Sequence, residues 1–290
     1  MRNGIFAAAA LLIAGCATTE PNSPAAQFDS VRLDAILAAQ APEDQARYQY
    51  RHPKETLEFF GVAPGMTVVD TLPGSVWYSG ILAAYLGSEG EVIGADYAYE
   101  MWPLFTGFAT EEFLAKRTTW AADWVTDSAE WAPADGATIN AITYGSIPEE
   151  MKGTVDVVMM VRAFHHFNRF EEEGGYRTAA LKAAMELLKP GGVVGVVQHR
   201  APEGNSDKSA EGDNGYVKQS TIIAAFEAAG FQFLGSSEVN ANPADTPGET
   251  DIVWRLPPTL ATSRDNPDLK AQMEAIGESD RMTLKFRKPE

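Results

Sequence analysis

Cysteine, histidine and positive charge are scarce in this chain of 290 residues. The only cysteine is Cys16, which excludes an intramolecular disulfide. Lys and Arg number 23 against 40 Asp and Glu, and the formal net charge is −17 at pH 7. Nucleic-acid backbones and anionic lipid surfaces repel such a chain, so we expect no nucleic-acid partner. No cysteine cluster or His-x-x-x-His pair favours a metal site, and we expect no bound metal.

The first residues, MRNGIFAAAALLIAGC, have the pattern of a secretory signal. Arg2 precedes an apolar run over residues 5–14, which is too short to span a bilayer as a helix. Residues 13–16, Ile-Ala-Gly-Cys, resemble a bacterial lipoprotein box, which implies a lipid on Cys16 after cleavage. We therefore expect export and a lipid anchor, on the periplasmic side of the outer membrane in a Gram-negative host. The alternative is a short buried helix with an incidental cysteine.

Hydrophobic periodicity divides the rest of the chain into alternating strands and helices. Strands are expected at 66–72, 91–97, 137–144, 156–164, 192–199, 231–239 and 280–288, and helices at 28–40, 77–87, 176–188 and 220–230. This alternation indicates a mostly parallel sheet. We assign residues 1–15 to a signal peptide, 16–44 to a tether and N-terminal helix, and 45–290 to one domain. Residues 240–275 form a long excursion between the last two strands.

The segment VVDTLPGSVWYSG, residues 68–80, has the layout of a strand, a loop and a helix start. A dinucleotide loop would have Gly-x-Gly-x-x-Gly, and a phosphate loop would end in Gly-Lys-Ser/Thr. Neither motif is present, so the loop does not indicate phosphate binding.

Polar residues follow the carboxyl ends of the expected strands, where open parallel sheets bind ligands. Three of the four histidines fall at these positions. The residues are Asp70, Leu72 and Gly74 after the first strand, Asp96 and Tyr97 after the second, Tyr144 and Gly145 after the third, Arg162, His165 and His166 after the fourth, and His199 after the fifth. An acid after the second strand can accept hydrogen bonds from ribose hydroxyls.

The segments VVDTLPGS, GEVIGADY, DVVMMVRAFHHF and LLKPGGVVGVV, in this order and spacing, resemble the class I S-adenosylmethionine-dependent methyltransferases. The beginning, RHPKETLEFFGVAPGMTVVD, is similar to a bacterial group of predicted methyltransferases. The resemblance covers residues 45–290. It implies a Rossmann-like α/β fold with a mostly parallel seven-stranded sheet and a C-terminal antiparallel hairpin. It also implies an S-adenosylmethionine-dependent methyltransferase with a small-molecule acceptor.

The resemblance assigns cofactor contacts to eight residues. Asp70, Leu72 and Gly74 match the loop around the methionine part, Asp96 and Tyr97 the ribose site, Tyr144 and Gly145 the adenine contact, and Arg162 the loop facing cofactor and acceptor. Two of the three alternate glycines of this loop are replaced, by Leu72 and Val76. A Cβ at a position that needs a positive φ costs about 1 kcal/mol or more.

His165, His166 and His199 are candidate general bases, because an unperturbed imidazole titrates near neutrality. Adjacent residues on a strand point in opposite directions, so His165 and His166 would chelate a metal poorly. Histidines that only pack or bond the backbone are the alternative.

Two other functions stay open. The replaced glycines and the expected export favour a non-catalytic ligand-binding protein derived from a methyltransferase. A dehydrogenase with a variant loop is the third hypothesis.

Overall fold

The computed structural model describes Met1 and residues 27–290. The rest of the predicted signal peptide, Cys16 and most of the tether lie outside the described residues. In the described part of the chain, no helix is both long and apolar enough to cross a membrane.

The described residues form an eight-stranded sheet whose main path runs β3-β2-β1-β4-β5-β8-β7. Strands β1 to β5 pair in parallel, β8 is antiparallel to both β5 and β7, and β6 pairs only with β5. The strands are β1 Thr67–Thr71, β2 Glu91–Asp96, β3 Thr138–Thr143, β4 Val155–Val161, β5 Leu188–Ala201, β6 Val217–Lys218, β7 Gln232–Ser237 and β8 Arg281–Arg287. The predicted mostly parallel sheet with an antiparallel C-terminal pair is confirmed.

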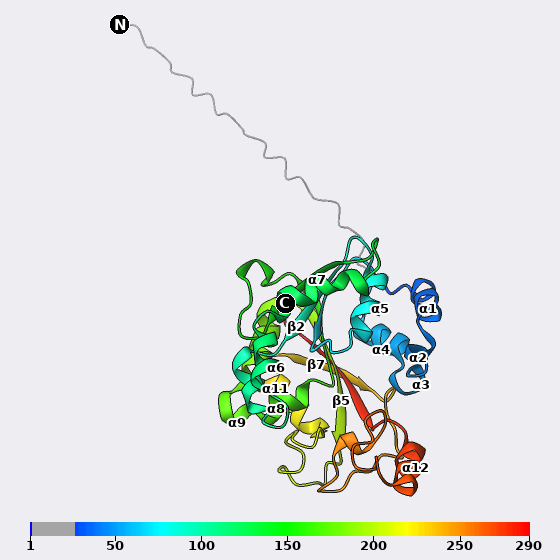
Figure 1. The fold of residues 1–290 in the computed structure, drawn as a ribbon. Coiled ribbons are helices and arrows are strands. Elements are labelled where there is room, and N and C mark those ends of the chain that lie inside the picture. The colour runs from blue at the N-terminus through cyan, green and yellow to red at the C-terminus, as the bar shows by residue number, and fades with distance from the viewer. Residues whose placement is uncertain (2–26) are drawn as a thin grey trace.

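Helices cover both faces of the sheet (Figure 1). The α-helices are α1 Ser30–Ala38, α2 Pro42–Gln45, α3 Tyr48–Arg51, α4 Pro53–Phe60, α5 Trp77–Leu86, α6 Glu111–Arg117, α7 Trp120–Asp127, α8 Phe164–Arg169, α9 Glu171–Gly174, α10 Tyr176–Leu187, α11 Gln219–Ala228 and α12 Pro267–Ile276. The 3-10 helices are η1 Tyr99–Leu104, η2 Ser128–Glu130, η3 Glu149–Met151 and η4 Val253–Arg255.

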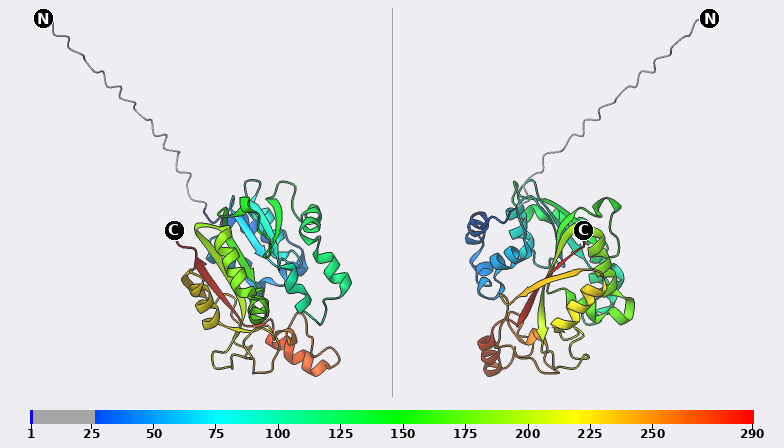
Figure 2. Two further views of the ribbon diagram at one scale, coloured as in Figure 1. Left: turned by 90° about the vertical axis from the view of Figure 1, so that its left-hand side faces the viewer. Right: turned by 180° about the vertical axis from the view of Figure 1, so that it is seen from behind.

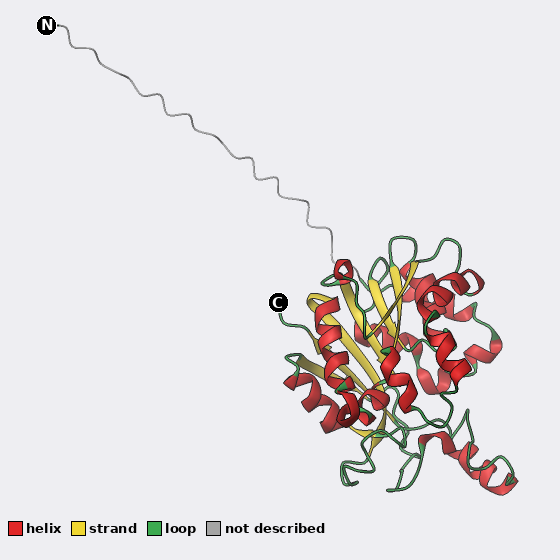
Figure 3. Ribbon diagram, turned by 60° about the vertical axis from the view of Figure 1, so that its left-hand side comes forward, coloured by secondary structure: helices red, strands yellow, loops and turns green. Residues whose placement is uncertain are grey.

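The two large hydrophobic cores of the described residues lie one on each face of the sheet, and a third, small cluster surrounds Tyr216. Side chains of α1, α4, α5 and α7 pack on one face, and those of η1, α8, α10 and α11 on the other. Figures 2 and 3 show α12 at the end of the sheet, away from both helical layers. The carboxyl ends of the parallel strands therefore lie between the N-terminal helices and the segment between β7 and β8.

The C-terminal boundary of one predicted strand is wrong. We expected a strand over 156–164, but β4 stops at Val161. Arg162 has a φ of 57°, and its backbone N–H donates to the carbonyl of Val197 at 2.7 Å. This left-handed residue turns the chain out of the sheet. His165 and His166 consequently lie in α8, so the strand argument about their directions does not apply.

The packing of α4 on the sheet depends on a glycine. A Cβ on Gly195 of β5 would lie 2.4 Å from the ring of Phe60, which is fully buried. Interiors are close-packed, so neither group has room to move freely.

We therefore expect Gly195→Ala to lower the free energy of unfolding by about 1–3 kcal/mol through overpacking. Urea denaturation would measure the loss. Gly204→Ala is the matched control, because no atom lies within 4 Å of its Cβ position. Adding Phe60→Leu to Gly195→Ala should recover part of the loss, and strictly additive effects would contradict the packing argument.

Candidate functional site

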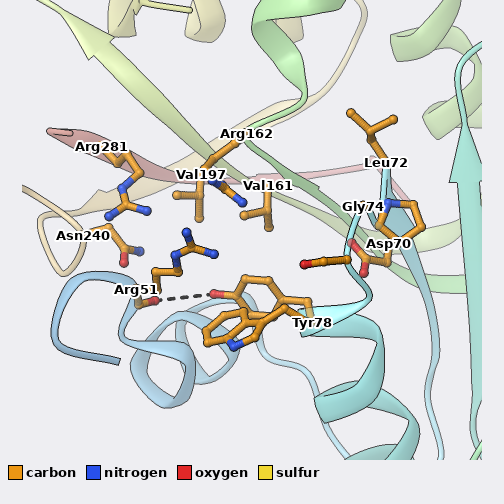
Figure 4. Close-up of a pocket in the computed structure, with 13 residues that line it drawn as sticks. Arg51, Asp70, Leu72, Gly74, Tyr78, Val161, Arg162, Val197, Asn240 and Arg281 are labelled. Atoms are coloured by element: carbon orange, nitrogen blue, oxygen red, sulfur yellow. Dashed lines mark hydrogen bonds between the residues drawn. The ribbon is translucent and has the colours of Figure 1, made fainter. Parts of the chain in front are cut away.

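A cavity of about 80 Å³ opens at the carboxyl ends of β1, β4 and β5. Strands β1 and β4 are neighbours in the sheet, but their connections run to opposite sides, so the cavity lies at the topological switch point. Its lining is Arg51, Asp70, Leu72, Pro73, Gly74, Ser75, Trp77, Tyr78, Val161, Arg162, Val197, Asn240 and Arg281 (Figure 4). Ligand sites in open α/β sheets occur at this place.

The loop after β1 keeps the left-handed backbone of a glycine loop, although two of its three alternate glycines are replaced. Leu72, Gly74 and Val76 have φ values of 54°, 57° and 54°. The N–H of Leu72 donates to the carbonyl of Ala95 at 2.7 Å, as the N–H of Arg162 does to Val197. Left-handed Leu and β-branched Val are rare, and such strain persists only where the surrounding structure imposes it.

Asp70 lies at the inner end of this loop. It is 3% exposed, and Ser79 Oγ donates to its Oδ2 at 2.6 Å. Burial raises the pKa of the Asp70 carboxyl to about 6, while the bond from Ser79 lowers it. A cation beside this carboxylate would be strongly favoured.

Asp96, the predicted ribose ligand, lies below the surface with both oxygens engaged. Its Oδ1 accepts from the backbone N–H of Tyr97 at 2.8 Å. Its Oδ2 accepts from Trp102 Nε1 and from Arg117 Nη1, each at 3.2 Å. Burial raises the pKa of Asp96, while the hydrogen bonds from Tyr97 and Arg117 lower it by less. A ribose hydroxyl could bond Asp96 only after Arg117 or Trp102 had moved.

The other residues predicted to contact the cofactor divide into two groups. Leu72, Gly74 and Arg162 line the cavity with Asp70. Tyr97 and Tyr144 are buried in the core; Tyr144 shares a hydrogen bond of 2.6 Å with Thr71 Oγ1, and Gly145 lies against Ala98. Trp77 and Tyr78 line the cavity, whereas Trp102 covers Asp96 and Trp120 stacks on Trp124.

The three candidate histidines come together beside the cavity. The ring centroids of His165 and His166 are 4.0 Å apart, and those of His165 and His199 are 5.7 Å apart. The Nδ1 atom of each ring has a hydrogen-bond partner. It is Gln198 Oε1 at 3.2 Å for His165, Tyr97 OH at 2.7 Å for His166, and Ser279 Oγ at 2.6 Å for His199. Burial lowers the pKa of all three, that of His165 to about 4. They are therefore uncharged at pH 7.

Sequence reasoning missed Arg51 and Arg281, which line the cavity with Arg162. Arg51 comes from the end of α3, and Arg281 begins β8. Because β8 is antiparallel, its first residue lies at the edge where the parallel strands end. The antiparallel direction of the last strand could therefore have predicted the position of Arg281, whereas no local sequence pattern marks Arg51.

No known family model and no characterised protein matches this chain by sequence. By structure, the chain is similar to the 4+2 cyclase SpnF, with a TM-score of 0.50 and 15% identity over 82% of this chain and 80% of that one. It is also similar to an S-adenosylmethionine-dependent methyltransferase from Aquifex aeolicus (TM-score 0.46, 19% identity, 74% and 94% covered). An arsenic(III) S-adenosylmethionine methyltransferase from Chlamydomonas reinhardtii gives a TM-score of 0.43 at 14% identity, with 89% and 73% covered.

The strand order and the likeness to SpnF define the class of fold. It is a Rossmann-like α/β fold of the class I methyltransferase type, as the sequence predicts. At these identities the likeness concerns the fold alone.

The buried histidines should make stability depend on pH. In the unfolded chain each imidazole binds a proton near pH 6.5, and in the folded chain it does not. The uncharged histidines contribute fully to the free energy of unfolding above pH 6.5, and this contribution is lost as the pH falls toward 4. His165 accounts for about 3 kcal/mol of the loss. Asp70, whose pKa is raised, opposes this loss between about pH 6 and 4.

We expect His165→Gln to flatten the fall in unfolding free energy between pH 6.5 and 4, measured by urea denaturation at each pH. Phe167→Leu, on the same helix, should destabilise the protein equally at every pH. An unchanged slope in His165→Gln would show that His165 is not the titrating group.

Proposed function

We propose that this protein is an S-adenosylmethionine-dependent methyltransferase acting on a small-molecule acceptor. The observation that carries the proposal is the loop after β1, which is left-handed at Leu72, Gly74 and Val76 and lines a cavity at the switch point of the sheet with residues 72–75. This is the place and the backbone shape that the resemblance requires for the methionine end of the cofactor.

The polar side chains of the site are suited to S-adenosylmethionine, but other side chains cover part of the site. Asp70 would pair with the ammonium of the methionine part. Asp96 would accept the ribose hydroxyls once Arg117 had left it. Tyr97, Tyr144 and Gly145 stay the predicted contacts on the ribose and adenine side. The cavity of about 80 Å³ is below the roughly 300–1,000 Å³ of pockets for ligands of comparable size, so the cavity must widen to hold the whole cofactor. Trp102 of η1 and Arg117 of α6 must in addition leave Asp96.

When bound, S-adenosylmethionine supplies a methyl group on a sulfonium sulfur, and its transfer to a nucleophile leaves a thioether. This chain's residues would position the acceptor, and positioning supplies much of the rate enhancement of an in-line displacement. His165, His166 and His199 stay the predicted general bases. They are uncharged at pH 7, but burial lowers their pKa and so weakens them as bases, and none of them lines the cavity. Positioning of the acceptor therefore carries the proposal.

We expect isothermal titration calorimetry of the purified protein to detect S-adenosylmethionine. Val76→Gly should strengthen that binding about threefold to tenfold, because it removes the β-branched side chain and leaves a left-handed position that can adjust around the ligand. Ser75→Gly, at the neighbouring position, is the control for added loop flexibility. It removes only a small side chain from the lining and should change the affinity less than Val76→Gly does.

No heat and no thermal shift at millimolar S-adenosylmethionine, in the natural chain and in Val76→Gly, would refute the proposal. Unchanged or weaker affinity in Val76→Gly alone would show that Val76 does not obstruct the loop.

A non-catalytic ligand-binding protein is the second candidate function. The small cavity and the bonds that close Asp96 favour it. A binding protein would hold a ligand in this cavity without consuming S-adenosylmethionine, whereas formation of S-adenosylhomocysteine with any small acceptor would decide for the enzyme.

We also propose that the protein is exported and that its only membrane contact is a lipid on Cys16. The support is the signal-like sequence of residues 1–16. In cells fed a labelled fatty acid, we expect label in the natural chain and none in Cys16→Ala. Equal label in both, or an unprocessed N-terminus in the cytoplasm, would contradict the assignment.

A further inference from the structure

Three guanidinium groups meet on one wall of the cavity. Arg51 comes from α3, Arg162 follows β4 and Arg281 begins β8, and Figure 4 shows them on the side opposite Asp70 and Gly74. Among residues 27–290, Glu278 is the one carboxylate that pairs with them. Its Oε1 lies 3.0 Å from Arg51 Nη2, and its Oε2 lies 3.0 Å from Arg281 Nη1. The wall thus carries two positive charges in excess.

Arg162 is the unpaired member of this cluster. Among the described residues its guanidinium has no hydrogen-bond or ion-pair partner, whereas those of Arg51 and Arg281 have several. Burial, followed by repulsion from Arg51 and Arg281, lowers the pKa of Arg162 to about 9. A cation held among like charges in this way destabilises the protein unless an anion joins it.

Further unsatisfied donors face the same space. Arg281 Nε is buried without an acceptor. The hydroxyl of Tyr78 lines the cavity and makes only a long contact of 3.5 Å with the carbonyl of Arg51, besides its bond with Thr56. Asn240, Val161 and Val197 lie on the same side of the cavity, and the two apolar side chains lower the local dielectric and so strengthen charge pairing. The cavity therefore offers N–H and O–H donors around a small space, and the planar forks of arginine match carboxylate and phosphate oxygens.

We propose that Arg162, with Arg51 and Arg281, binds the carboxylate or phosphate group of an anionic small molecule, the methyl acceptor. The identity of that molecule as an acceptor rests on the proposed function, whereas the anion site does not. Asp96 ends β2, on one side of β1, while Arg162 and Arg281 lie at β4 and β8 on the other. With neighbouring strands about 4.8 Å apart, β8 lies about 14 Å from β1, so the cluster faces away from the predicted ribose site.

The cofactor also has a carboxylate, so the experiment must separate two sources of the anion. Thermal unfolding of the purified protein would be followed with inorganic phosphate and with acetate, at constant ionic strength set by chloride. Each titration would be repeated with saturating S-adenosylhomocysteine.

For the natural chain we expect the melting temperature to rise with phosphate or acetate. Arg162→Gln should melt higher than the natural chain without the anion, since it removes an unpaired charge, and its apparent anion affinity should fall at least tenfold. Arg287→Gln is the matched control, because Arg287 ends β8, the strand that Arg281 begins, and so lies far from the cavity at the other end of that strand. It should respond to the anions as the natural chain does.

If Arg162→Gln does not fold, Arg162→Lys keeps the charge without the fork and should bind the anions more weakly than the natural chain. An anion response equal in Arg162→Gln and the natural chain, or absent from the natural chain, would overturn the anion site.

If phosphate or acetate still raises the melting temperature at saturating S-adenosylhomocysteine, the site binds an anion other than the cofactor's carboxylate, which supports the acceptor. A response that S-adenosylhomocysteine abolishes, together with weaker S-adenosylhomocysteine binding in Arg162→Gln, would overturn the acceptor and assign the arginines to the cofactor's carboxylate. An anion response that depends on Arg162 without any S-adenosylhomocysteine binding would keep the site and refute the proposed function.

Discussion

The carboxylate of Glu278 connects two parts of the chain that are far apart in sequence. It pairs with Arg51, 227 residues earlier, and with Arg281 at the start of β8. All three side chains are buried, and loss of one partner from such a group costs about 3–5 kcal/mol. The pairing holds the N-terminal helices against the C-terminal strand pair, and these two elements form one wall of the cavity. Both the size of the cavity and its charge depend on this contact.

Backbone strain in the described residues is concentrated near the same cavity. Of five non-glycine residues with positive φ, Leu72, Val76 and Arg162 lie in or next to its lining, and His52 follows Arg51. Each costs of order 1–3 kcal/mol, which the two packed cores must offset. Natural sequences depart from local preference mainly at functional sites. The strain therefore singles out the ends of β1 and β4 without reference to any related protein.

Periodicity was sufficient to predict most of the fold. The strands at the centre of the sheet are continuously apolar, and α5 and α10 end close to their predicted bounds. The end of β4 was predicted wrongly because the left-handed conformation of Arg162 depends on its bond to Val197, a long-range contact.

The contents of the site were harder to predict than its position. Residues just after the strands were expected to gather, and Asp70, Gly74 and Arg162 do line one cavity. Arg117 and Trp102, which close Asp96, come from a segment without clear periodicity. Their role follows from how that segment folds back over β2, and local sequence carries no information about such a path.

The charge of the whole chain and the charge of the cavity have opposite signs. The net charge of −17 creates a field that repels anions, yet the wall of the cavity carries excess positive charge. At physiological salt the Debye length is about 8 Å, so exposed acids beyond that distance are largely screened. Pairs between a guanidinium and an oxyanion inside a partly buried cavity are screened much less. Local charge therefore decides which ligand is held, while the overall charge slows the approach of anions and makes that approach faster as salt rises. An acidic protein can in this way bind an anion selectively without attracting polyanions to its surface.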